Sequence, residues 1–66
     1  MEVVINGKPL QAAATLSLAQ AVALLTDAET GVAAAVNGDV IRRAAWAATP
    51  LSDGDEVEVL TAVQGG

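Results

Sequence analysis

Short β-branched, apolar stretches separated by Asn, Gly and Asp residues make up most of this chain. The first stretch, Glu2 to Asn6, alternates in polarity and is rich in Val and Ile, which predicts a strand. Asn6 and Gly7 both tolerate positive φ, and an Asn-Gly pair in this position predicts a tight hairpin turn. We therefore expect a return strand around residues Leu10 to Ala13.

A helical pattern follows this hairpin. Ser17 and Gln20 have the spacing of a capping box, in which the Ser hydroxyl accepts a hydrogen bond from the N3 amide while the Gln side chain reaches back. The next apolar residues repeat with helical spacing, so we expect one apolar stripe that faces a core. Its members are Leu18, Ala21, Val22 and Leu25, and the residues from Asp27 to Gly31 end the helix.

The second half of the chain predicts three further strands and a short helical segment. A second Asn-Gly pair predicts another tight turn. An Ala-rich stretch with one Trp is long enough for about one helical turn before a proline stops it. In chain order, we expect a strand at Val32 to Val36, the Asn37-Gly38 turn, a short strand at Val40 and Ile41, the helical turn within Arg42 to Pro50, a turn at Ser52 to Asp55 and a last strand at Glu56 to Val63.

Length and composition restrict the fold to one small globular domain, since the chain has 66 residues and 53% of them are hydrophobic. Many of these are alanines, so the core is thin. Cys and His are absent, so neither disulfides nor a Cys/His metal site can reinforce it. We expect the domain to occupy residues 1–63. Residues 64–66 should form a flexible C-terminal tail, because two successive glycines are costly to order.

Charge and motif content limit the possible activities. The net charge of −5 opposes binding to nucleic acid or to an anionic membrane and favours a basic protein partner. The N-terminus does not resemble a signal peptide and no apolar run approaches the roughly 20 residues of a membrane span, so we expect a cytoplasmic protein. Without His, Cys or a glycine-rich phosphate-binding motif, we expect no catalytic residues and no bound cofactor.

Three other features have a functional and a structural interpretation. The acidic cluster of Asp53, Asp55, Glu56 and Glu58 lacks the spacing of a calcium-binding loop, so we expect a solvated surface and no metal site. Trp46, the sole aromatic residue, could anchor a partner, but we favour a place at the edge of the core. Arg42 and Arg43 are too few for nucleic-acid binding.

The motifs VNGDVIRRAAW and LSDGDEVEVLTAVQGG resemble those of the ThiS family, the sulfur carrier proteins of thiamine thiazole biosynthesis. The similarity covers essentially the whole chain. Its most specific parts are Asn37-Gly38, Arg43 three residues before Trp46, Asp53-Gly54-Asp55 and the terminal Gly65-Gly66. Where the family often has proline just before the arginine, this chain has Arg42.

The resemblance implies an α+β fold, the ubiquitin-like β-grasp, with a mixed sheet of four to five strands and one helix packed across one face. The first and last strands would lie parallel and adjacent at its centre. Alternation along the strands then separates an inner from an outer face. The inner face would carry Val3, Ile5, Val32, Ala34, Val36, Val57 and Val59. The outer face would carry Val4, Ala33, Ala35, Leu60 and Ala62, edged by Glu2, Glu56 and Glu58.

The resemblance also implies that Gly66 is the site of sulfur attachment, as a 1-thioglycine. A terminal carboxylate is ionised at neutral pH and is a poor electrophile, so a partner must activate it with ATP as an acyl-adenylate before sulfur can replace oxygen. Gly65 and Gly66 have no Cβ, so the tail can enter a narrow active site, with Gln64 and Gly65 giving access. The residues expected to dock partners are Val4, Leu60 and Ala62.

The implied partners are a ThiF-like adenylyltransferase related to ubiquitin-activating enzymes, a ThiG-like thiazole synthase and a sulfur-donating protein. The chain would be a protein co-substrate and not an enzyme. Two alternatives stay open. One is a sulfur carrier for molybdopterin or for a sulfur-containing amino acid, and the other is a ubiquitin-like tag whose Gly66 forms an isopeptide bond to lysine.

Overall fold

The computed structural model of this chain describes residues 1–12, 14–28 and 30–61. The predictions made for Ala13, Ala62, Val63, Gln64, Gly65 and Gly66 lie outside the described residues. The elements in chain order are β1 (Glu2–Ile5), β2 (Lys8–Gln11), α1 (Leu18–Leu25), β3 (Val32–Val36), β4 (Asp39–Ile41), the 3₁₀-helix η1 (Arg43–Ala48) and β5 (Glu56–Thr61).

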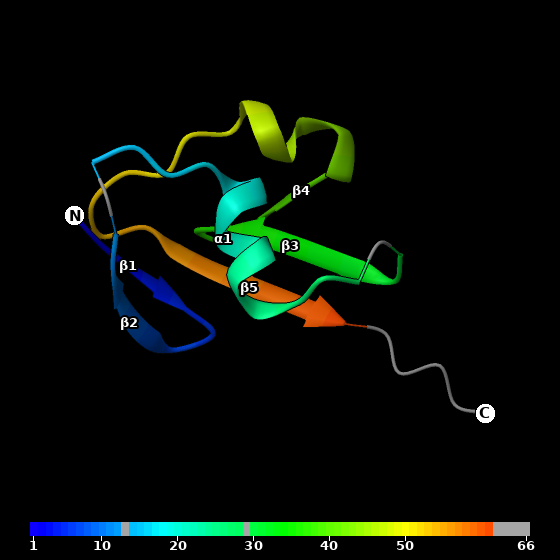
Figure 1. The fold of residues 1–66 in the computed structure, drawn as a ribbon, viewed down its shortest axis with the longest axis horizontal. Helices are drawn as coiled ribbons and strands as arrows, with labels where there is room; N and C mark the ends of the chain where they lie inside the picture. Colours follow the sequence, from blue (N-terminus) through cyan, green and yellow to red (C-terminus); the bar gives the residue numbers. More distant parts are fainter. Residues whose placement is uncertain (13, 29, 62–66) are drawn as a thin grey trace.

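The five strands form one mixed sheet in the order β2-β1-β5-β3-β4. β1 and β5 are parallel neighbours at its centre, and the other pairs are antiparallel. Figure 1 shows α1 lying across one face of this sheet, with η1 beside one end of the helix. This is the arrangement that the sequence resemblance implies. β5, the strand that leads to the C-terminus, lies between β1 and β3.

Turns of the same type connect the strands of the two hairpins, β1 with β2 and β3 with β4. Asn6 and Gly7 have φ values of 51° and 81°, and Asn37 and Gly38 have 51° and 89°. Positive φ at both central residues defines a type I′ turn, whose twist matches that of the flanking strands. Both predicted Asn-Gly turns are confirmed.

The prediction for the second strand was wrong at its start. We expected it to begin near Leu10, but β2 begins at Lys8. A two-residue turn pairs Ile5 directly with Lys8, and Pro9 then lies opposite Val4. Proline is tolerated there because β2 is an edge strand, and the missing N–H removes no hydrogen bond from the interior of the sheet.

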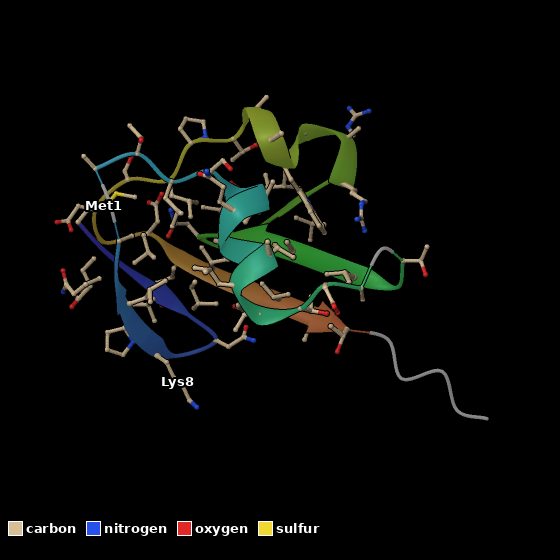
Figure 2. The ribbon with its side chains drawn as sticks, in the orientation of Figure 1. Met1 and Lys8 are labelled. Atoms are coloured by element: carbon tan, nitrogen blue, oxygen red, sulfur yellow. The ribbon has the colours of Figure 1, made fainter. Side chains whose placement is uncertain are left out.

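The core lies between α1 and the inner face of the sheet. Figure 2 shows side chains filling this space. Its buried members are Val3, Ile5, Leu18, Ala21, Val22, Ala34, Trp46, Leu51, Val57 and Val59. Val32 and Val36 are partly buried against them. The inner face predicted from the strand alternation is therefore confirmed, and all of its members except Ala34 are β-branched.

Helix α1 starts as its sequence predicts. Ser17 Oγ accepts a hydrogen bond from the Gln20 backbone N–H at 3.1 Å, and Gln20 Oε1 accepts one from the Ser17 N–H at 2.9 Å. The predicted apolar stripe is correct for its first three members, but Leu25 is 49% exposed. Because α1 has only eight residues, Leu25 falls at its last position, with Thr26 already in extended backbone.

The Ala-rich segment forms a longer helical piece than the single turn we expected. η1 extends over six residues, and Trp46 within it is 5% exposed. The Trp46 Nε1–H donates to the Ile41 carbonyl at 2.8 Å, so its one polar group is satisfied. The core position predicted for Trp46 is confirmed. Across the described ranges, every helix is too short or too polar to span a bilayer.

Candidate functional site

The outer face of the sheet, opposite α1, exposes an apolar surface around the end of β5. Leu60 is 68% exposed and Val40 is 78% exposed. The strand register pairs Leu60 with Ala33 and Val40 with Ala35, so these four side chains share one face. We call these four residues the outer patch. They line most of a shallow hollow of about 230 Å³, together with Ala34, Gly38 and Glu58.

Val40 was missed by the sequence analysis, which assigned it to a strand but to no face. The signal was available, because the tight Asn37-Gly38 turn places Val40 opposite Ala35. Val4, by contrast, lies across from Glu56 at the start of β5. Leu60 is four residues further along, or about 13 Å at the usual strand rise. The structure therefore joins Leu60 with Val40, Ala33 and Ala35, and places the half-buried Val4 apart from them.

Acidic side chains border the outer patch on β5. Glu56 and Glu58 alternate with the buried Val57 and Val59, so both carboxylates lie on the same face as Leu60. This surface combines exposed apolar groups with negative charge. Such a combination suits a partner that offers apolar side chains flanked by cations.

Asp53 and Asp55, the other two members of the acidic cluster, build the turn before β5. Asp53 Oδ1 accepts from the Glu2 backbone N–H at 2.7 Å. Asp55 accepts from the Ser52 N–H at 2.7 Å and from Asn37 Nδ2 at 3.0 Å. In the described part of the chain, no three acidic side chains gather closely enough to hold a metal ion. The two aspartates use their oxygens to fix the position at which β5 begins.

Two asparagine side chains hold β5 at its two ends. Asn6 Oδ1 accepts from the Val59 N–H at 2.8 Å, and Asn6 Nδ2 donates to the Val59 carbonyl at 3.1 Å. Asn37 Oδ1 accepts from the Glu56 N–H at 2.9 Å, while the Asn37 N–H donates to the Glu56 carbonyl at 2.7 Å. The sequence analysis gave these asparagines only a role in their turns. Contacts to Val59, 53 residues away from Asn6, leave no local signal in the sequence.

β5 ends at Thr61, opposite Val32 at the start of β3. This end of the strand leads to the residues expected to carry the chemistry. Those residues, Gln64, Gly65 and Gly66, and the expected docking residue Ala62 lie outside the described residues.

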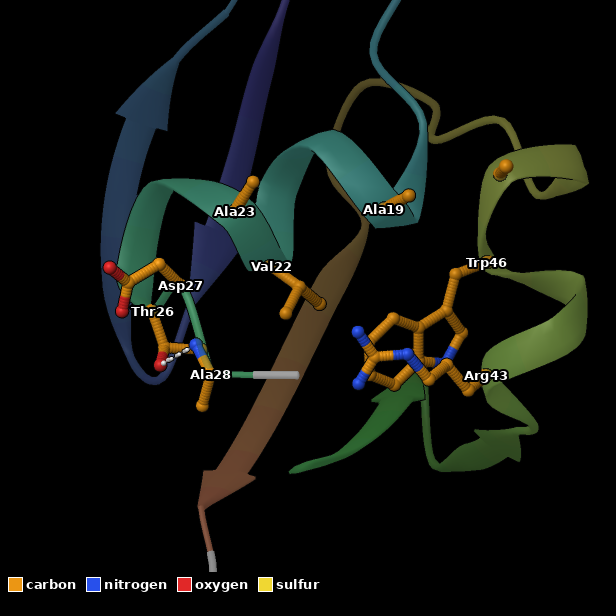
Figure 3. Close-up of a pocket in the computed structure, with 9 residues that line it drawn as sticks. Ala19, Val22, Ala23, Thr26, Asp27, Ala28, Arg43 and Trp46 are labelled. Atoms are coloured by element: carbon orange, nitrogen blue, oxygen red, sulfur yellow. Dashed lines mark hydrogen bonds between the residues drawn. The ribbon is translucent and has the colours of Figure 1, made fainter. Parts of the chain in front are cut away.

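A second hollow lies on the helix side of the sheet. It has a volume of about 280 Å³, and Figure 3 shows Arg43 and Trp46 on one side of it and the end of α1 on the other. The Arg43 guanidinium lies 5.2 Å from the centre of the Trp46 ring, within the range of a cation–π contact. The other residues that line this hollow are Ala19, Val22, Ala23, Thr26, Asp27, Ala28 and Ala47. Apart from Arg43, Asp27 and the Thr26 hydroxyl, the lining is apolar.

The sequence matches the model of the ThiS family over residues 3–66. The chain belongs to the ThiS family. It is 27% identical over 66 residues to the sulfur carrier protein ThiS of Escherichia coli (strain K12), with 100% of each chain covered. The family resemblance noted in the sequence is confirmed.

Two solved structures of a ThiS protein from Geobacter metallireducens resemble this family member in fold. The crystal structure of that thiamine biosynthesis protein has a TM-score of 0.79 and 36% identity, and the match covers 100% of both chains. A solution structure of a thiamine biosynthesis protein from the same organism has a TM-score of 0.81 and 36% identity, covering 100% of this chain and 88% of the other. The expected ubiquitin-like β-grasp fold is confirmed.

The departure of this ThiS family member from the family's sequence pattern has a structural explanation. Arg42 stands where the family often has proline, and its backbone has φ −64° and ψ 148°. Proline restricts φ to about −65°, so Arg42 has adopted the φ value that the ring would impose. The replacement therefore leaves the backbone path into η1 compatible with the family's pattern.

Proposed function

We propose that this protein carries sulfur on its C-terminal Gly66 for the thiazole of thiamine. The observation that carries this proposal is the ThiS family match, which extends to Gly66 and includes the Gly65-Gly66 pair. The printed names of the relatives, a sulfur carrier protein and thiamine biosynthesis proteins, support this pathway over molybdopterin or amino-acid synthesis. The exposed end of β5, from which the chain continues towards Gly66, gives it physical support.

The proposed chemistry takes place on the main chain of this protein. A carboxylate oxygen of Gly66 attacks the α-phosphorus of ATP, which releases pyrophosphate and forms an acyl-adenylate. Sulfur at the oxidation level of sulfide, supplied by a partner protein, then adds to the carbonyl carbon. The bond from that carbon to the phosphate-linked oxygen breaks, AMP leaves with this oxygen, and a thiocarboxylate remains. A residue with a Cβ would obstruct attack, which favours glycine at this position.

Partner proteins supply the catalysis in this proposal. The chain has no His, no Cys and no glycine-rich phosphate-binding motif, and we propose that it acts as a co-substrate and not as an enzyme. The proposed location is the cytoplasm. We propose a ThiF-like adenylyltransferase that uses ATP, a sulfur-donating protein and a ThiG-like thiazole synthase as its partners. The outer patch is the proposed docking surface, with Leu60 nearest in sequence to the tail.

The test is a reconstituted sulfur transfer followed by intact-mass measurement. The protein is incubated with ATP, the ThiF-like partner and a sulfur donor, and a carrier gains the mass difference between one sulfur atom and one oxygen atom. A chain that ends at Gly65 and a chain with one alanine added after Gly66 should gain nothing. Covalent adducts to lysine would identify a protein tag instead. Sulfur delivery by the alanine-extended chain without trimming would contradict the proposal.

A further inference from the structure

We propose that Asn6 is a positioning residue for the sulfur-transfer reaction, and that it acts by holding the end of β5 from which the reactive tail continues. This inference rests on the proposed function. It concerns the Asn6 side chain, which makes a reciprocal pair of hydrogen bonds with the backbone of Val59.

The backbone pairing between β1 and β5 is short. The Val4 N–H donates to the Asp55 carbonyl at 2.9 Å, and the Asn6 N–H donates to the Val57 carbonyl at 2.9 Å. At Asn6 the chain turns away into the hairpin, so the β1 backbone cannot reach the next outward pair on β5, the N–H and carbonyl of Val59. The Asn6 carboxamide supplies the missing acceptor and donor. The Asn6 side chain thereby extends the hydrogen bonding between β1 and β5 by one residue of β5, beyond the end of β1.

This added contact lies one residue before Leu60, the most exposed apolar residue of β5. Without it, residues from Val59 to Thr61 would be held by described strands only through pairing with β3, on one side. Gly66 lies five residues beyond Thr61, a span of at most about 18 Å when fully extended. A partner docked on the outer patch must therefore place its active site within this distance of Thr61. The Asn6 contact fixes the position of the end of β5, from which the tail must reach that active site.

The other Asn-Gly turn offers a matched control. Asn37 has the same φ of 51° as Asn6, and its side chain also bonds β5, but at Glu56 at the far end of the strand. Asn6→Gly and Asn37→Gly each remove one carboxamide and leave a residue that accepts positive φ. Each adds one glycine to the unfolded chain, so the entropic cost of the change is the same in both variants.

The first measurement is hydrogen exchange of the Val59 amide in the free carrier. The Asn6→Gly variant should speed this exchange by about 5-fold or more, since losing one or two net hydrogen bonds corresponds to such a factor. In the Asn37→Gly variant, exchange of the Val59 amide should stay within about 2-fold of the native rate, after correction for any change in the free energy of global unfolding. Unchanged exchange in the Asn6→Gly variant would overturn the inference.

The second measurement is pyrophosphate release by the ThiF-like partner at increasing carrier concentration. For Asn6→Gly we expect KM for the carrier to rise about 2- to 10-fold with kcat unchanged, because more of the chain must be ordered on docking. Asn37→Gly should keep the native KM. Asn6→Asp is a second variant, should the glycine variant fold poorly. It tolerates the turn and keeps an acceptor for the Val59 N–H but has no donor for the carbonyl, so it should shift KM in the same direction.

Equal KM changes for the two glycine variants would overturn the inference while leaving the sulfur-carrier proposal intact. A raised KM without faster Val59 exchange would indicate direct contact of Asn6 with the partner and would also overturn it. If the ThiF-like partner releases no pyrophosphate with the native protein, and the native protein gains no sulfur, the proposed function fails, and the inference fails with it.

Discussion

Neighbouring residues of the same strand lie on opposite faces of the sheet and differ in solvent exposure. On β5, Val59 is 6% exposed and Leu60, the next residue, is 68% exposed. Both are aliphatic, so hydropathy alone does not separate them. The difference arises because α1 covers one face of the sheet (Figure 1). The other face presents the outer patch to solvent. Burial against the helix stabilises the fold, and the exposed face is left for partners.

The largest effect should come from truncation on the inner face. Ile5→Ala removes a side chain that is 5% exposed and should lower the free energy of unfolding by about 2–5 kcal/mol. A domain of this size has a total stability of roughly 3–10 kcal/mol, so much of the protein would unfold. Urea denaturation followed by the fluorescence of Trp46, the sole aromatic residue, measures this directly.

The matched variant for this experiment is Val4→Ala, on the same strand but on the outer face. Val4 is half-buried, and we expect a loss of about 1 kcal/mol. If both truncations cost the same free energy, the contrast between a packed and an open face would be wrong for β1.

The next effect concerns docking through the outer patch. Leu60→Ala should change the unfolding free energy by no more than about 0.5 kcal/mol, because most of the side chain is already in water. If Leu60 is a central contact of the proposed interface, its truncation should lower kcat/KM for pyrophosphate release by the ThiF-like partner about 5- to 30-fold, the effect of losing 1–2 kcal/mol of binding free energy.

Leu24 provides the control for Leu60. It is 63% exposed, nearly the same as Leu60, but it lies on α1 at the other side of the sheet. Leu24→Ala should leave the activation kinetics within about 2-fold of native. A larger loss for Leu24→Ala than for Leu60→Ala would place the interface on the helix side and reject the outer patch.

The sequence predicted the local features of this protein well. The bounds of β3, the Ser17–Gln20 capping box and both type I′ turns depend on residues that are close in the chain. Each is decided by backbone conformation or by a short hydrogen-bonded ring, so a short window of sequence contains the necessary information.

Features that depend on distant parts of the chain could not be predicted in the same way. The exposure of Leu25 depends on where α1 ends relative to the core. The bonds between Asn6 and Val59 require β1 and β5 to be neighbours, which the alternation of residues does not specify. The candidate site is built from such contacts, so the fold was easier to predict than the arrangement around β5.

The smallest effect should come from the charged residue that lies over Trp46 on the helix side. Arg43→Gln removes the charge 5.2 Å from the ring centre and should lower the unfolding free energy by about 0.5–1 kcal/mol, the value of an exposed cation–π contact. Arg42→Gln is the control, since it removes the same charge one residue away without the ring contact and should stay within about 0.5 kcal/mol of native. Urea denaturation reports both values, and kcat/KM for pyrophosphate release should be unchanged in either variant. Arg43 lies on the helix side of the sheet. If Arg43→Gln lowered kcat/KM for pyrophosphate release more than Leu60→Ala does, partners would bind the face that α1 covers. That result would reverse the roles assigned to the two faces.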